Sequence, residues 1–358
     1  MKTLFMVLFL FTVEAVADDL PTPPAPEAAD FDFDFDFDFD DFELNFLFGA
    51  WVARALRKAE HRLSHYGIAL TDVIDLRKSR HHDIRDIESV CLALGPYRNL
   101  TTLTATTLFL HPNCQVLNHA GQRIYGNRQV DFLQDFSEEK LNRFLRFAIQ
   151  ISSSGDRGDI GGSITHSHAF DSRYRTKEIC EKAGVATRKA RIKSLFWKES
   201  LRTSNVIRER RVDLGDIFEK ESRLRFLLPI RNPMDCAVSN LKTGHVDRFP
   251  GLTRSSSTQE CVHAILDEIF WFAKLQSEFP DRFHYFFEYD ISPAMLVDLA
   301  GFLQLDPDVT WIDNALVAMK INPGYDHEDA LARSYLDYVN SEGACFPELS
   351  AGLRAFVH

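Results

Sequence analysis

The sequence predicts an α/β protein with three layers, in which helices cover both faces of a mostly parallel sheet. Short apolar runs of strand length alternate with longer segments of helical periodicity, a pattern typical of parallel sheets. Several of these segments end at Gly-Pro, His-Pro or Arg-Asn-Pro, which stop one element and begin the next. With 358 residues, 45% of them hydrophobic, the chain is long enough to bury a large core.

The elements follow from the period of the apolar residues and from the turn residues beside them. Strands are expected at 89–94, from 116–117 onward, and at 192–197, 224–230 and 284–289. Helices are expected at 46–65, 101–110, 137–151, within 204–220, and at 261–279, 294–303, 312–319 and 329–341. Residues 152–163 are rich in Gly and Ser and are expected to form a loop. Together these elements define one predicted domain, residues 44–358.

The amino-terminal segment differs in composition from this domain. Residues 1–17 contain Lys2, an apolar run and Ala15-x-Ala17, which predict a signal peptide or short anchor; a miscalled start is the alternative. Residues 18–43 are predicted to be an acidic low-complexity linker. A genuine leader would place the protein in the secretory pathway or Golgi lumen, and otherwise a cytoplasmic location is expected. Membrane contact is expected only if the first segment is an uncleaved anchor.

The net charge of −11 resides in the leader and linker. Residues 1–43 hold twelve acidic residues and one basic residue, so the remainder is neutral overall. A nucleic-acid surface needs a basic excess, and no nucleic-acid partner is therefore expected. The six cysteines show no paired spacing, which predicts neither a disulfide framework nor a metal site.

The segment 224–240 predicts a strand followed directly by a helix. Asn232 suits the helix cap and Pro233 the first helical position. Arg231 then lies at the carboxyl end of the strand, where α/β sheets bind ligands. Ser239 lies about two helical turns beyond the cap, so a guanidinium and a hydroxyl face one crevice and suit a phosphate. The alternative is a structural salt bridge from Arg231 to Asp235.

The segment 92–112 predicts a second strand–loop–helix unit. Its loop offers backbone N–H groups and a helix N-terminus to an anion. Arg98 adds a positive charge, and Thr101 and Thr102 add hydroxyl groups at the first helical turn. The alternative is an ordinary βα unit in which the threonines cap the helix. No Walker Gly-Lys-Ser/Thr is present, which argues against an ATPase.

Taken together, these two units resemble those of sulfotransferases that use 3′-phosphoadenosine 5′-phosphosulfate (PAPS). Pro96, Arg98, Thr101 and Thr102 match the 5′-phosphosulfate loop Pro-x-Arg-Ser-Gly-Thr-Thr, and Arg231-Asn-Pro-x-Asp with Ser239 matches the 3′-phosphate motif. Segments 192–200 and 284–306 resemble further blocks of the family in the same order. The resemblance implies a P-loop NTPase-like αβα architecture, PAPS as cosubstrate and no metal.

The family's roles transfer to the matching positions. They assign Arg98, Asn99, Leu100, Thr101 and Thr102 to the 5′ side of the nucleotide. Arg231 and Ser239 are assigned to its 3′-phosphate. Asn99 replaces the family's Ser and keeps its hydrogen-bonding capacity, whereas Leu100 replaces Gly. If that position requires a positive φ, Leu100 is costly there and weakens phosphate binding.

Sulfuryl transfer also needs a cation and a base. Lys198 is the expected cation beside the sulfuryl group, unless it is a solvated strand-end lysine. His119 is the expected base because imidazole titrates near neutrality. His168 and His166 are rivals, and Glu199 is a further candidate.

The resemblance predicts a sulfotransferase acting on a hydroxyl or amine acceptor, which could be a small molecule or a glycan. The alternatives are a catalytically degenerate nucleotide-binding protein and a nucleotide-dependent phosphotransferase of related fold.

Overall fold

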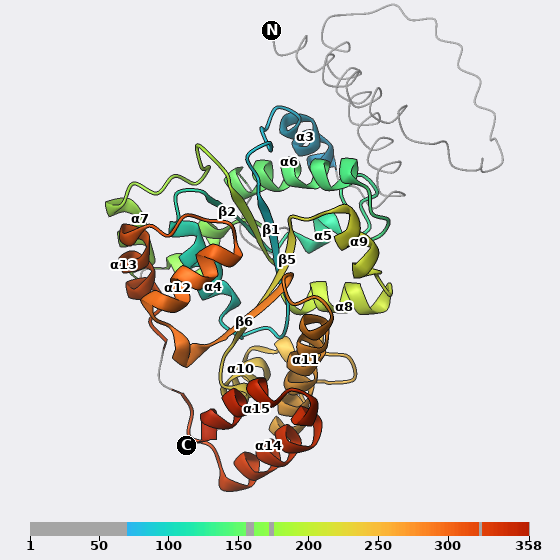
Figure 1. Ribbon diagram of the computed structural model, residues 1–358, viewed down its shortest axis with the longest axis vertical. Coiled ribbons are helices and arrows are strands. Elements are labelled where there is room, and N and C mark those ends of the chain that lie inside the picture. The colour runs from blue at the N-terminus through green and yellow to red at the C-terminus, as the bar shows by residue number, and fades with distance from the viewer. Residues whose placement is uncertain (1–69, 155–160, 172–174, 322–323, 358) are drawn as a thin grey trace, which may run out of the picture.

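The computed structural model describes residues 70–154, 161–171, 175–321 and 324–357 (Figure 1). The predicted leader, linker and helix 46–65 lie outside these residues. Within these described ranges, six strands form one sheet in the order β3-β2-β4-β1-β5-β6. Every neighbouring pair is parallel except β2 and β3, which are antiparallel. The strands are β1 (Ser89–Ala93), β2 (Cys114–Asn118), β3 (Gly162–Ser163), β4 (Ser194–Lys198), β5 (Leu224–Ile230) and β6 (Phe283–Phe287).

Helices cover both faces of this sheet, which confirms the predicted α/β class with a mostly parallel sheet (Figure 1). One face packs against α4 (Thr101–Leu110), α7 (Thr176–Lys182), α12 (Pro293–Phe302) and α13 (Val309–Ala318). The other packs against α6 (Glu138–Ser154), α8 (Leu201–Glu209), α9 (Leu214–Lys220), α10 (Pro233–Thr243) and α11 (Thr258–Glu278). The described helices also include α3 (Leu70–Ser79), α5 (Gly121–Ile124), α14 (Asp329–Glu342) and α15 (Pro347–Arg354).

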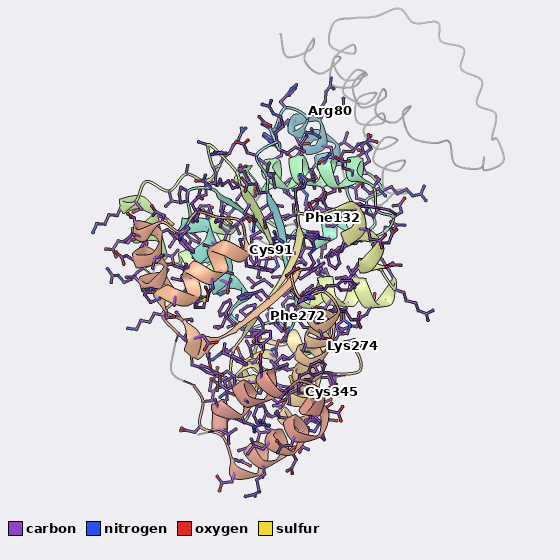
Figure 2. The ribbon with its side chains drawn as sticks, in the orientation of Figure 1. Arg80, Cys91, Phe132, Phe272, Lys274 and Cys345 are labelled. Carbon is purple, nitrogen blue, oxygen red and sulfur yellow. The ribbon has the colours of Figure 1, made fainter. Side chains whose placement is uncertain are left out.

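Alternation along β1 shows why both faces are buried. Val90 and Leu92 belong to the cluster under α6 and α11, whereas Cys91 and Ala93 belong to the cluster under α4 and α12. All four side chains are fully buried. A continuous apolar run is therefore the expected signature of such a strand. In Figure 2, Cys91, Phe132 and Phe272 lie within the molecule.

Two boundary predictions were wrong for local reasons. The region 204–220 holds two helices, because Asp213 caps α9 by accepting a hydrogen bond from the N–H of Asp216. The expected loop at 152–163 begins as the last turn of α6 and ends as β3, which pairs with β2. The helices α3, α5, α7 and α15 were not predicted; α5, α7 and α15 have only four to eight residues, which is too short for a period of 3.6 to be recognised.

The six cysteines are all free thiols, and five of them are buried. Among the described residues, no helix has the length and apolar character needed to cross a bilayer.

The cap of α10 follows the prediction closely. Asn232 accepts a hydrogen bond from the N–H of Met234 at 3.0 Å, and Pro233 occupies the first helical position. We expect Asn232→Ala to lower the free energy of unfolding by about 1 kcal/mol, because the capping oxygen is lost, whereas Asn232→Gly costs only a few tenths. Urea denaturation of both variants measures the difference. Identical values for Ala and wild type would contradict this role.

Candidate functional site

Two adjoining cavities, of about 280 and 260 Å³, lie at the carboxyl ends of β1, β2, β4 and β5. They share five lining residues, Tyr97, Thr102, His119, His168 and His245. Within the sheet, β2, which α4 connects to β1, lies towards one edge from β1. The strands β5 and β6 lie towards the opposite edge, so the strand order reverses at β1. Ligands of α/β sheets bind at such a reversal of strand order.

The loop between β1 and α4 is shaped by left-handed backbone. Arg98 has φ 63°, and Leu100, which caps α4, has φ 59° and ψ 0°. Gly95 also has a positive φ, and a Cβ there would lie 2.2 Å from Leu228 Cδ1. Position 100 therefore does have the positive φ that was considered in the sequence, and Leu100 adopts this conformation at an energetic cost.

The same backbone feature recurs around the cavities. Seven described non-glycine residues have positive φ, and five of them lie at the carboxyl ends of β1, β2 and β4: Arg98, Leu100, His119, Ala120 and Ser200. Such conformations cost about 1–3 kcal/mol each and persist where the surrounding structure enforces them. Their concentration here marks this edge of the sheet as the candidate functional site.

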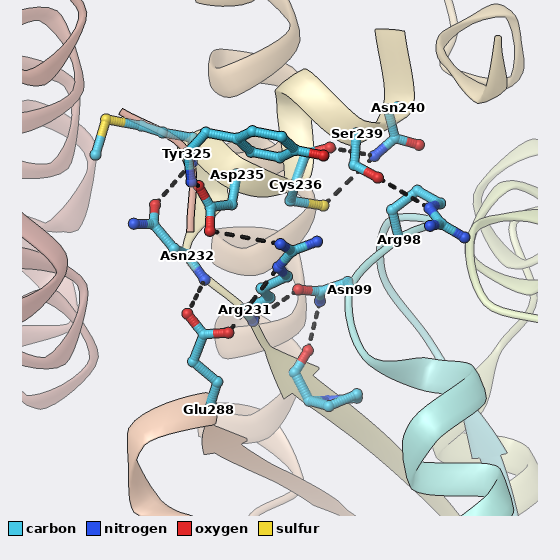
Figure 3. A network of polar contacts seen from close by, with 12 residues as sticks. Arg98, Asn99, Arg231, Asn232, Asp235, Cys236, Ser239, Asn240, Glu288 and Tyr325 are labelled. Carbon is cyan, nitrogen blue, oxygen red and sulfur yellow. Dashed lines mark hydrogen bonds and ion pairs between the residues drawn. The ribbon is translucent and has the colours of Figure 1, made fainter. Parts of the chain in front are cut away.

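Asn99 joins the segment that follows β1 to the segment that follows β5 (Figure 3). Its side chain is fully buried, donates to the carbonyl oxygen of Pro229 and accepts from the N–H of Arg231 at 2.8 Å. The Asn99 amide is thus engaged within the protein, where it ties the loop that carries Arg98 to the end of β5 that precedes Arg231. Its role on the 5′ side of a nucleotide stays a prediction.

The first cavity is strongly cationic. Arg98, Lys198, Arg231 and Lys320 line it together with Thr101 and Thr102, and no described Asp or Glu does so. Arg98 Nε also donates to Ser239 Oγ at 3.0 Å, so the predicted serine lies beside the cavity-lining guanidinium. The structure therefore groups the residues predicted to bind the two phosphates.

Arg231 lines the first cavity and also forms the alternative salt bridge to Asp235, but this bridge is long. Its Nη2 lies 3.5 Å from Asp235 Oδ2, and its Nε lies 4.0 Å from Glu288 Oε2 and makes no hydrogen bond among the described residues. The carboxylates have closer partners: Asp235 Oδ1 lies 2.8 Å from His327 Nε2. Glu288 accepts from the N–H of Asn232 at 3.0 Å (Figure 3). The guanidinium retains donor capacity toward the cavity.

Lys198 and His119 form a buried pair. Lys198 Nζ lies 3.0 Å from His119 Nε2, which suits an ammonium donating to a neutral imidazole. Burial lowers the pKa of Lys198, an effect that Glu199 opposes and Arg98 strengthens. Burial also holds the pKa of His119 far below its usual value, with Lys198 and Arg202 adding to the effect. The expectation that His119 titrates near neutrality is therefore corrected.

Glu199 lies on the second cavity and is 1% exposed. Its Oε2 accepts from the N–H of Gly121 at 3.0 Å, and its Oε1 lies 3.2 Å from Arg202 Nη1. Burial raises the pKa of this carboxyl, against the opposing effect of Arg202. His166 and His168 also line the second cavity.

Four charged or titratable cavity residues were not predicted: Arg202, His245, Arg248 and Lys320. Arg202 stands in the first turn of α8, His245 and Arg248 follow the end of α10, and Lys320 follows α13. Only their position after an element end could have indicated them.

Comparison with known proteins adds little to this geometry. No protein-family model and no curated protein sequence matches the chain. Among solved structures, a mouse sulfotransferase, SULT7A1, in complex with PAP is similar with a TM-score of 0.38 and 10% sequence identity. The similarity covers 81% of this chain and 96% of that one. At these values it establishes neither a family nor an activity.

The strain at Leu100 can be tested by comparing Leu100→Gly with Leu100→Ala. Both remove the side chain beyond Cβ and its packing contacts, but only glycine also lacks Cβ and therefore accepts a positive φ without cost. We expect the glycine variant to be more stable than the alanine variant by about 1 kcal/mol, the reverse of the order in a helix interior. Urea denaturation measures the difference, and an alanine variant equal to or more stable than the glycine variant would show that the position is unstrained.

Proposed function

We propose that this protein is a PAPS-dependent sulfotransferase that transfers a sulfuryl group to a hydroxyl or amine acceptor. The observation that carries the proposal is the first cavity: four cationic side chains line it, no described carboxylate does, and two of the guanidinium groups come from distant segments coupled by Asn99. A ligand with two separate anionic ends fits this arrangement.

The residues present suit the two ends of such a nucleotide. Arg98, the N-terminus of α4 and the hydroxyls of Thr101 and Thr102 would hold the 5′-phosphosulfate. Arg231 and Ser239 would hold the 3′-phosphate. The hydrogen bond between Arg98 and Ser239 would then give way to bonds with the ligand. A buried guanidinium Nε without a hydrogen-bond partner, as in Arg231, is a donor that a phosphate would satisfy.

The transfer step needs charge stabilisation and a proton acceptor. As the bond from sulfur to the bridging oxygen breaks, its electron pair stays with the 5′-phosphate, and the ammonium of Lys198 would stabilise that charge. The acceptor oxygen bonds to sulfur and gives its proton to a base. Because the pKa of Glu199 is raised and that of His119 is lowered, Glu199 is the better matched base at neutral pH.

The competing functions predict different ligands. A phosphotransferase that uses a magnesium-bound nucleotide needs oxygen ligands for the metal beside the phosphates. The absence of carboxylates among the described residues of the first cavity favours a metal-free donor. A degenerate binding protein would bind the nucleotide without sulfuryl transfer, so an assay with PAPS and a range of acceptors separates it from an enzyme.

Nucleotide affinity tests the two phosphate positions separately. We expect 3′-phosphoadenosine 5′-phosphate (PAP) to bind more tightly than AMP or ATP, because only PAP has both anionic ends correctly placed. Arg231→Gln should lower PAP affinity about 10- to 100-fold and leave AMP affinity unchanged, since a charge-assisted hydrogen bond is lost only at the 3′ side. Arg98→Gln should lower both affinities.

Isothermal titration of each variant measures these values. Arg143→Gln, on the exposed side of α6, is the matched control and should bind as wild type does. An Arg231→Gln variant with unchanged PAP affinity, or tighter binding of ATP than of PAP by wild type, would reject the proposed cosubstrate.

The base is tested by the pH dependence of transfer. A base acts only when deprotonated, so with Glu199 the rate should rise through a pKa above that of an ordinary glutamate and fall at alkaline pH as Lys198 loses its proton. We expect Glu199→Gln to lower kcat about 100-fold and to remove the acid limb, with PAP affinity retained. His119→Gln should keep the acid limb. A wild-type rate in Glu199→Gln together with a lost acid limb in His119→Gln would restore the histidine as base.

A further inference from the structure

The second cavity lacks the walls that an apolar acceptor requires. Its lining contains none of the residues Ala, Val, Leu, Ile, Met, Phe and Trp among the described part of the chain. An apolar ligand gains affinity by leaving water for a hydrophobic surface, and most small-molecule pockets are lined mainly by such side chains. This cavity therefore suits a polar ligand.

The charges of the cavity do not cancel. Glu199 is the one described carboxylate in its lining, and Arg202 stands 3.2 Å from it. Arg248 lines the same cavity and forms no ion pair with a described carboxylate. Lys198 stands beside it, bonded to the shared residue His119. The cavity thus retains an unbalanced guanidinium.

Two buried side chains of the lining also have unused hydrogen-bonding capacity. Asn118 and Ser167 are both more than nine-tenths buried, and Asn118 Oδ1 and Ser167 Oγ have no hydrogen-bond partner among the described residues. Leaving such groups unpaired costs about 1–3 kcal/mol each. Both atoms lie just beneath the surface of the cavity lining, so a small rotation of either side chain would let it pair with a ligand hydroxyl group, whereas an apolar ligand offers no partner.

From these three observations we propose that the second cavity binds the acceptor and that the acceptor is an acidic sugar, with hydroxyl groups and a carboxylate on one ring. Arg248 is the residue that determines specificity for the charge, through a charge-assisted pair with the carboxylate. This inference rests on the proposed sulfotransferase function and specifies its acceptor. The acceptor hydroxyl would lie in the cavity that contains Glu199 and borders Lys198. There Glu199 can take its proton while its oxygen bonds to the sulfur of the sulfuryl group.

A matched pair of sugars tests the inference. Methyl β-glucuronide and methyl β-glucoside differ only in the carboxylate that replaces the hydroxymethyl group, and 4-methylphenol, which is uncharged at neutral pH, represents an apolar acceptor. Each is titrated into the full-length protein saturated with PAP. We expect the glucuronide to bind about tenfold more tightly than the glucoside, as one charge-assisted hydrogen bond allows, and the phenol to bind most weakly.

Substitution of Arg248 identifies the residue responsible. Arg248→Gln should remove the preference for the glucuronide without changing glucoside affinity. Arg254→Gln is the control, because Arg254 is exposed, pairs with Asp247 at 3.0 Å and lines neither cavity. It should keep the full preference.

Four results would overturn the acceptor inference: equal affinity for the two sugars, tighter binding of the phenol, no binding of the glucuronide, or a preference for the glucuronide that survives Arg248→Gln. In each case, binding of PAP would still support the nucleotide site. If PAP itself does not bind, the proposed function fails. The three acceptors are then titrated against the free protein, where the glucuronide preference and its loss in Arg248→Gln still decide whether the cavity recognises an acidic sugar.

Discussion

The geometry of the site depends on the buried side chain of Asn99. The register of β1 and β5 pairs Ala93 with Leu227, and the N–H of Leu94 still bonds to Leu227, so Pro229 and Arg231 extend beyond the last partner on β1. Buried backbone groups without hydrogen-bond partners are costly, and the Asn99 amide pairs with both the carbonyl oxygen of Pro229 and the N–H of Arg231. The side chain thus replaces the backbone partners that β1 no longer supplies, and this contact holds Arg98 and Arg231 at one cavity.

The arrangement has an electrostatic cost in the absence of a ligand. Arg98, Lys198, Arg231 and Lys320 line one cavity without a described carboxylate, and like charges at short range repel each other. Burial is the main cause of the lowered pKa of Lys198; Glu199 opposes it, and Arg98 adds a smaller repulsion that disfavours the charged form. The left-handed backbone at Arg98, Leu100 and Ser200 adds a separate conformational cost at the same site. An anionic ligand relieves the repulsion, which is a physical reason for such a site to bind one.

Local signals explain how much of the fold and site could be predicted. The strand β5 and the helix α4 were predicted at their observed bounds, because an apolar run, a helix cap and a proline act within a few residues. Arg98, Lys198 and Arg231 were expected at one site because of the resemblance to sulfotransferases. The structure places them together because each follows or ends a parallel strand, and the carboxyl ends of parallel strands meet at one edge of a sheet. The strand order and the identity of neighbouring helices needed the structure.

Other features depend on contacts that no local pattern contains. Asn99 looks like a ligand-binding residue in the sequence, yet its partners lie on β5, at Pro229 and Arg231. His119 looks like a titrating imidazole, but burial and Lys198 depress its pKa. His245 and Arg248 reach the cavities from the turn after α10 and have no motif of their own. Packing between distant segments determines all of these properties.

We expect one nucleotide to span the first cavity with its two anionic ends held by separate segments of the chain. A crystal structure of the protein with PAP should show the 3′-phosphate within hydrogen-bond distance of the Arg231 guanidinium and the 5′-phosphate at Arg98 and the N-terminus of α4. A nucleotide bound elsewhere, or held at one end only with Arg231 still turned to Asp235 and Glu288, would contradict it.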